Sequence, residues 1–197
     1  MVASIDFDQR RSFTESIWRL SVAQYHSMLE HGIFAQDAQV ELLEGLLVAK
    51  MPKNPPHRLS TGLLQDVLLS NLPSNYHLNL QEPLTLADSE PEPDLAVVVG
   101  SRLDYRDRHP QGQEVALVVE VADSSLERDR TLKQGIYAKP GIPNYWILNL
   151  SDRTLEVYTD PSDAGRYRQR QVLTETETMT FTLNQAAIAS FKVARVL

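Results

Sequence analysis

Hydrophobic residues recur along this chain at two spacings, one typical of helices and one typical of strands. Between residues 57 and 72 they return every three to four positions, which predicts a helix with one apolar stripe. The stripe consists of Leu59, Leu63, Leu64, Val67, Leu68 and Leu72. Upstream, residues 22–31 fit a short helix capped by Ser21, and residues 40–51 alternate as a strand or hairpin around Gly45.

The rest of the chain contains short β-rich runs with one helix among them. Strands are expected at 78–86 (broken at Pro83), 94–99, 115–121, 145–150 and 155–158, and the helix is expected at 128–138. The run 115–121 is almost continuously apolar, which predicts a strand covered on both faces in the middle of an α/β sheet. Trp146, in a later run, is expected in the core. The predicted order is helix, three strands, helix, strand, after an N-terminal helix and hairpin.

The composition is typical of a globular protein. Of the 197 residues, 42% are hydrophobic and 23% are charged, which is sufficient for a packed core. No internal repeat or low-complexity tract divides the chain. We therefore expect a single domain over residues 1–197.

The absence of cysteine limits both the compartment and the chemistry. It excludes disulfides, thiolate zinc sites and cysteine nucleophiles, so any metal must be held by oxygen or imidazole. It also favours a reducing, cytoplasmic compartment, and no signal peptide is expected at the N terminus. The longest apolar stretch, 115–121, is too short to cross a bilayer, so no membrane partner is expected.

The charge balance limits how the chain can bind nucleic acid. A formal net charge of −7 argues weakly against a broad DNA-binding surface, because such binding depends largely on Lys and Arg. A local basic cleft is compatible with it. Two arginine clusters are interpreted as solvated surface charge: Arg102, Arg106 and Arg108, and Arg166, Arg168 and Arg170. The sequence leaves the oligomeric state open, and a homodimer is one option.

Two carboxylates lie in the β-rich runs. Asp94 begins one predicted strand and Glu120 ends the next. A carboxylate among buried apolar residues is costly unless it is paired or bound to a cation, so each needs a partner. If the strands are neighbours, both can converge on a hard divalent ion such as Mg²⁺ or Mn²⁺. The alternative is that each acid lies at a strand end and accepts hydrogen bonds from loop amides.

Four motifs in order extend this interpretation. They are EPDLAVV at 92–98, LVVEVADSS at 117–125, DRTLKQGIY at 129–137 and GIPNYWI at 141–147. Together with ELLEG at 41–45 and the proline-rich turn before His57, they resemble the Uma family of restriction-endonuclease-like proteins in the PD-(D/E)xK nuclease superfamily. The resemblance covers roughly residues 20 to 190. It implies a restriction-endonuclease-like α/β core, a mixed central sheet flanked by helices.

The resemblance also implies a catalytic set. Asp94 and Glu120 match the two metal-holding acids, whereas the usual lysine position after Glu120 is Ala122, which carries no charge. The family pattern places the lysine on the following helix, where Lys133 stands, and its ammonium would assist the attacking water or stabilise the phosphate. The alternative is a solvated helix lysine paired with Asp129. Possible supporting residues are Glu41, Glu44, His57 and Tyr137.

Other catalytic signatures are missing from the sequence. There is no GxSxG elbow, no GxGxxG or P-loop and no HExxH motif, which argues against serine hydrolases, dinucleotide enzymes and zincins. Two functions are compatible with the chain. One is an endonuclease that hydrolyses phosphodiester bonds in DNA with Mg²⁺ or Mn²⁺ and binds DNA weakly and salt-sensitively. The other is a non-catalytic binding or assembly module that keeps the nuclease fold.

Overall fold

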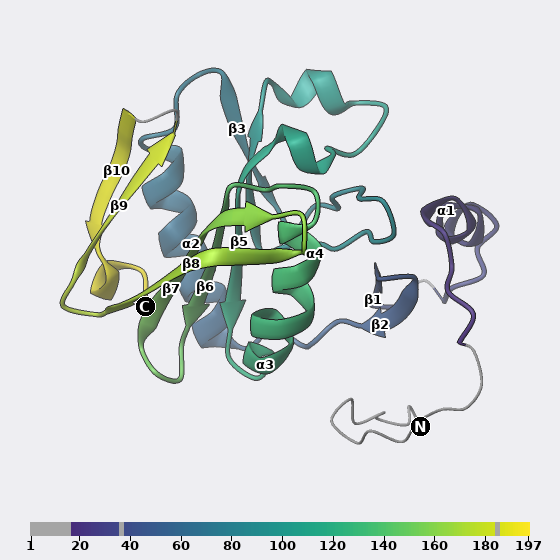
Figure 1. Ribbon diagram of the computed structural model, residues 1–197, viewed down its shortest axis with the longest axis horizontal. Helices are drawn as coiled ribbons and strands as arrows, with labels where there is room; N and C mark the ends of the chain where they lie inside the picture. Colours follow the sequence, from purple (N-terminus) through teal and green to yellow (C-terminus); the bar gives the residue numbers. More distant parts are fainter. Residues whose placement is uncertain (1–16, 36–37, 184–185) are drawn as a thin grey trace.

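A six-stranded mixed sheet forms the centre of the fold (Figure 1). The computed structural model describes residues 17–35, 38–183 and 186–197. In this part of the chain the sheet order is β3-β4-β5-β6-β7-β8, with strands at Tyr76–Leu80, Leu95–Val99, Val115–Ala122, Asn144–Asn149, Thr154–Ser162 and Arg166–Thr174. Strands β5 and β6 pair in parallel, because a helical crossover joins them, and the remaining neighbours are antiparallel.

Helices and two hairpins surround this sheet. The α-helices are α1 (Val22–Glu30), α2 (Pro55–Leu69), α3 (Leu126–Arg128) and α4 (Gln134–Ala138), with a π-helical turn, η3 (Asp129–Lys133), between the last two. Short 3₁₀ turns are η1 (Arg102–Tyr105), η2 (Gly112–Glu114) and η4 (Val193–Arg195). The hairpins are β1 (Val40–Leu43) with β2 (Leu46–Ala49), and β9 (Thr178–Leu183) with β10 (Ala186–Lys192). None of the described helices is long and apolar enough to span a lipid bilayer.

One face of the sheet packs against α2 and the β9–β10 hairpin. Helix α2 buries Leu64, Val67 and Leu68 in this layer because they lie on one side of the helix. Trp146 of β6 is fully buried here and meets the ring of Phe181 edge-on at 5.0 Å between centroids. The expectation that Trp146 belongs to the core is confirmed.

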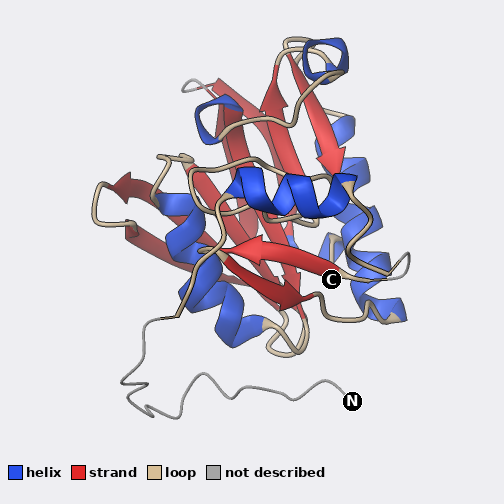
Figure 2. Ribbon diagram, turned by 90° about the vertical axis from the view of Figure 1, so that its right-hand side faces the viewer, coloured by secondary structure: helices blue, strands red, loops and turns tan. Residues whose placement is uncertain are grey.

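The opposite face packs against the continuous helical segment α3–η3–α4, so that helices lie on both sides of the sheet (Figure 2). Ile136 and Tyr137 of α4 are buried against the sheet, where the Tyr137 ring lies 5.1 Å from that of Tyr145. Hairpin β1–β2 is linked to the sheet region through an isolated bridge between Leu42 and Glu90. This layer brings the helical segment against β5, where Lys133 and Tyr137 contact Glu120.

The predicted mixed α/β core, with its N-terminal helix and hairpin, is confirmed. Ser21 accepts a hydrogen bond from the Gln24 amide as the N-cap of α1, and β1 and β2 turn at Glu44 and Gly45 as expected. Helix α2 begins two residues earlier than predicted, because Asn54 is its N-cap and proline is well tolerated in the first turn.

The structure differs from the sequence-based expectations in three places. The segment expected to be extended over 78–86 is a strand only as far as Leu80. Gln81 has a positive φ of 56°, which interrupts the strand there. The helix predicted over 128–138 begins at Leu126 and contains a π-helical turn. Strands β8, β9 and β10 were not predicted.

Candidate functional site

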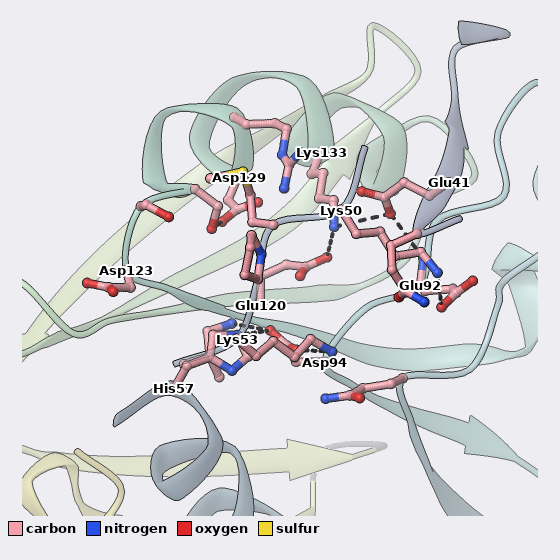
Figure 3. Close-up of a pocket in the computed structure, with 18 of the residues that line it drawn as sticks. Glu41, Lys50, Lys53, His57, Glu92, Asp94, Glu120, Asp123, Asp129 and Lys133 are labelled. Carbon is pink, nitrogen blue, oxygen red and sulfur yellow. Dashed lines mark hydrogen bonds and ion pairs between the residues drawn. The ribbon is translucent and has the colours of Figure 1, made fainter. Parts of the chain in front are cut away.

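A cleft of about 530 Å³ opens where β4 and β5 meet the loop before α2 and the helical segment α3–η3. Its walls carry charged and polar side chains of both signs, shown in Figure 3. The acids that line it are Glu41, Glu92, Asp94, Glu120, Asp123 and Asp129, and the basic residues are Lys50, Lys53, His57, Arg128 and Lys133. The three residues predicted as catalytic, Asp94, Glu120 and Lys133, therefore lie in one cleft.

Asp94 is held at the start of β4 by contacts from three directions. Its Oδ2 accepts a hydrogen bond of 2.9 Å from the Val121 amide and lies 3.1 Å from His57 Nε2. Its Oδ1 lies 3.5 Å from Lys53 Nζ. Burial alone would raise the pKa of Asp94, but the contacts with His57, Val121 and Lys53 outweigh it, and the pKa lies below its usual value. Asp94 is therefore an ionised carboxylate at neutral pH.

Glu120 is the one charged residue of β5, a strand buried along its entire length. Its Oε1 accepts hydrogen bonds from Lys133 Nζ at 2.9 Å and from the Tyr137 hydroxyl at 2.6 Å. Among the residues that the structure describes, no donor contacts the other oxygen, Oε2. Burial raises the pKa of Glu120 to about 8, despite the charge of Lys133.

Lys133 reaches Glu120 from the C-terminal end of the π-helical turn and is only 4% exposed. It also lies 3.5 Å from Glu41 Oε2. Burial alone would lower the pKa of Lys133, but Glu120, Glu41 and Asp129 outweigh it, and the pKa lies above its usual value. The interpretation of Lys133 as a solvated lysine is wrong, because its ammonium is buried between carboxylates.

Asp129 lies at the N-terminal end of the same π-helical turn. Its Oδ2 accepts a hydrogen bond of 2.5 Å from Ser125, whereas its buried Oδ1 has no hydrogen-bond partner among the described residues. Burial raises the pKa of Asp129. π-Helical turns are frequent at functional sites, and this one directs both Asp129 and Lys133 into the cleft.

These side chains suit a hard divalent cation such as Mg²⁺ or Mn²⁺. Asp94 and Glu120 could each offer one carboxyl oxygen to it, and Asp129 Oδ1 has no hydrogen-bond partner among the described residues. Within the described part of the chain, no group of three or more His, Cys, Asp or Glu side chains forms a ready-made metal cluster. That donor set fits Mg²⁺, which is usually held by one or two carboxylates together with water and substrate phosphate.

The sequence profile of the Uma2 family, described as "Putative restriction endonuclease", matches residues 22–189. The chain belongs to this family. Among solved structures, a similar chain is a protein from Anabaena variabilis ATCC 29413 described as a "putative nuclease belonging to DUF820". The two are 15% identical with a TM-score of 0.59, over 86% of this chain and 96% of the other, which establishes a shared fold. Among curated proteins, none matches the chain.

The supporting residues expected from the Uma2 resemblance divide into two groups. Glu41, His57 and Tyr137 contact Lys133, Asp94 and Glu120 respectively. Glu44 does not reach the cleft. It sits at the β1–β2 turn with a φ of 47° and pairs with Lys139 at 2.5 Å, so its side chain points away from the site. Glu44 is therefore the one suggested supporting residue that the structure of this Uma2 protein does not bring to the cleft.

The surroundings of the site differ in two respects from what the sequence suggested. The cleft contains more basic side chains than expected, because the loop before α2 contributes Lys50 and Lys53 and the helix α3 contributes Arg128. In addition, Arg170 is not merely solvated surface charge, since its Nη2 lies 3.0 Å from the fully buried Glu156.

Proposed function

We propose that this protein is a metal-dependent endonuclease that hydrolyses phosphodiester bonds in DNA. The observation that carries the proposal is the convergence of two suitably placed acids, the ionised Asp94 and Glu120, whose proton a metal would replace, with the buried ammonium of Lys133 in one cleft. Membership of the Uma2 family supports it. A bound Mg²⁺ or Mn²⁺ would supply activated water and charge neutralisation at the phosphate.

Each side chain has a separate task in this proposal. Asp94 and Glu120 would hold the metal through Oδ1 and Oε2, the oxygens that the fold leaves available. Lys133 keeps its proton at neutral pH, because the surrounding carboxylates raise its pKa. It therefore acts as a fixed positive charge that stabilises the negative charge developing on the phosphate, rather than as a base.

Two further residues position this set. His57 lies in the first turn of α2, where its amide donates to Asn54 and its imidazole contacts Asp94 Oδ2. Tyr137 orients Glu120 through a hydrogen bond to Oε1. One oxygen of each acid is occupied in this way, which would leave Asp94 Oδ1 and Glu120 Oε2 as the oxygens that bind the metal.

A cleavage assay tests the proposal. Linear, supercoiled and branched DNA are incubated at low ionic strength with wild type and with Asp94→Asn, each with Mg²⁺, with Mn²⁺ and with chelator. We expect metal-dependent cleavage by wild type and its loss in Asp94→Asn, a substitution that keeps the size of the side chain. Titration with Mn²⁺ by calorimetry gives an independent readout of the metal site.

The competing function is a binding or assembly module with a nuclease fold. It would be favoured if folded, metal-loaded wild type left all three DNA forms uncut, or if Asp94→Asn cut them as rapidly as wild type. The buried ion pairs would then serve only the structure of the cleft.

A further inference from the structure

Lys53 lies against the one oxygen of Asp94 that the fold leaves free. Oδ2 is occupied by His57 and by the Val121 amide, whereas Oδ1 has Lys53 Nζ at 3.5 Å. This distance exceeds the roughly 2.7–2.9 Å of a charge-assisted hydrogen bond. The Lys53 side chain is also 35% exposed, in contrast to the buried Lys133. Lys53 is therefore a loosely held counter-ion that solvent reaches.

The position of Lys53 conflicts with a metal on Asp94. An ammonium and a divalent cation repel each other strongly at such short distances, so they do not share one carboxylate oxygen. Lys53 stands in the loop between Pro52 and the N-cap Asn54, and only its flexible four-carbon side chain has to move for the ammonium to leave. Figure 3 shows Lys53 beside Asp94 and His57, on the side of the cleft opposite Lys133.

A phosphate group that enters the cleft would be a second partner for the ammonium of Lys53. Lys50 and Arg128 line the same cleft, together with six acids, so a phosphate there depends on individual cations rather than on a basic surface. Lys50, however, already forms a close ion pair of 2.6 Å with Glu92. Of these two lysines, Lys53 is the one whose present contact a metal would abolish.

We propose that Lys53 is a resident counter-ion of Asp94 that a divalent cation displaces, and that the released ammonium then binds a phosphate of the DNA backbone. This rests on the function proposed above. Metal binding and DNA binding are thereby coupled, because the first makes Lys53 available for the second. By linkage, DNA must strengthen metal binding by the same factor.

Displacement of Lys53 by the metal is tested by calorimetric titration with Mn²⁺. The proteins compared are wild type, Lys53→Met, Lys53→Arg and Lys50→Met. Removing the competing charge should make Lys53→Met bind Mn²⁺ about fivefold more tightly, within the usual range for coupled sites. Lys53→Arg keeps the charge and should bind as wild type does. Lys50→Met removes a charge three residues away that does not contact Asp94, and should change the affinity by less than about twofold.

Binding of the released Lys53 to a DNA phosphate is tested by fluorescence anisotropy with a short labelled duplex. Affinity is measured over a range of salt concentrations, with and without Ca²⁺ as a hard divalent cation. With the cation, Lys53→Met should lower the slope of log affinity against log salt by about one, as expected for one lost phosphate contact. Without it, wild type and Lys53→Met should have the same slope, because Asp94 retains the lysine.

Two results would overturn this inference while leaving the proposed nuclease intact. One is equal Mn²⁺ affinity in wild type and Lys53→Met. The other is an unchanged salt slope for Lys53→Met in the presence of the cation. Absence of Mn²⁺ binding and of DNA cleavage in wild type itself would instead remove the proposed function, and this inference with it.

Discussion

Glu120 is a carboxyl group within an otherwise apolar strand, and its surroundings determine its charge. It is 5% exposed and lies near Asp129, Asp94 and Glu41, which disfavour its ionisation together with burial. Lys133 opposes this effect but does not cancel it, since the pKa remains raised to about 8. A proton and a divalent cation therefore compete for the same carboxyl group.

The raised pKa of Glu120 predicts how stability depends on pH. Between its usual pKa of 4.5 and the folded value of about 8, the folded protein keeps a proton that the unfolded chain releases. The contribution of Glu120 to stability is therefore present at low pH and is lost as pH rises through this window. Metal-free wild type should lose more thermal stability between about pH 5 and pH 8 than Glu120→Gln, which has no proton to release.

The measurement is the thermal midpoint of both metal-free proteins across this pH range. Mn²⁺ should reduce the loss in wild type at the alkaline end, because the cation replaces the proton. Parallel curves for wild type and Glu120→Gln would show that Glu120 has an ordinary pKa in the folded protein.

At the level of single residues, the sequence predicted the acids well and the cations less well. Asp94 and Glu120 stood out because a carboxylate beside apolar strand residues requires a partner. Lys133 was identified from the family pattern, since its i, i+4 spacing from Asp129 is equally typical of a solvated helix pair. Lys53 gave no such signal, because its role depends on the distance to Asp94 across 41 positions of sequence.

On the scale of elements, the helical segment α3–η3–α4 is fixed to the sheet by a second buried acid. Glu156 lies on the same cross-strand row as Glu120, with Ile147 between them. Its Oε1 accepts hydrogen bonds from Arg130 of the π-helical turn, at 2.9 Å from Nε, and its Oε2 contacts Tyr158 and Arg170. Arg130 precedes Lys133 by three residues, so this contact holds the turn from which Lys133 extends.

This arrangement predicts that Arg130→Met destabilises the protein. The fully buried Glu156 loses a charged donor, which should cost about 1–2 kcal/mol because Arg130 is itself partly exposed. Arg168→Met is the matched control, since Arg168 is a largely exposed β8 residue paired with Asp160. Urea denaturation would show the difference, and equal midpoints for Arg130→Met and Arg168→Met would contradict the anchoring role.

Most elements with strong periodicity were predictable, but the regularly alternating strand β9 was missed. Strand β5 is apolar except for Glu120, and α2 has helical spacing, so both were identified. The π-helical turn has no signal of its own in the sequence. Strand β8 was missed because it is mostly exposed and polar. Strand β9 was missed although its burial alternates regularly, with Met179, Phe181 and Leu183 buried.

For the whole molecule, the net charge of −7 is not offset at the cleft. Lys50, Lys53, Arg128 and Lys133 line it together with six acids, so bound metal would have to neutralise part of the acidic charge before a phosphate could enter. DNA contact through so few cations should be weak and strongly dependent on salt. This favours a substrate bound mainly at the cleft over one bound across a wide surface.

The most direct test of the account is the rate of DNA cleavage by Lys133→Met relative to wild type, at metal concentrations that saturate both folded proteins. If Lys133 stabilises charge on the phosphate, the rate should fall by about 10²-fold or more while Mn²⁺ still binds, as is usual for loss of one preorganised donor. If Lys133 serves only to neutralise Glu120, the folded variant should cleave within about threefold of the wild-type rate, and the catalytic account would be wrong.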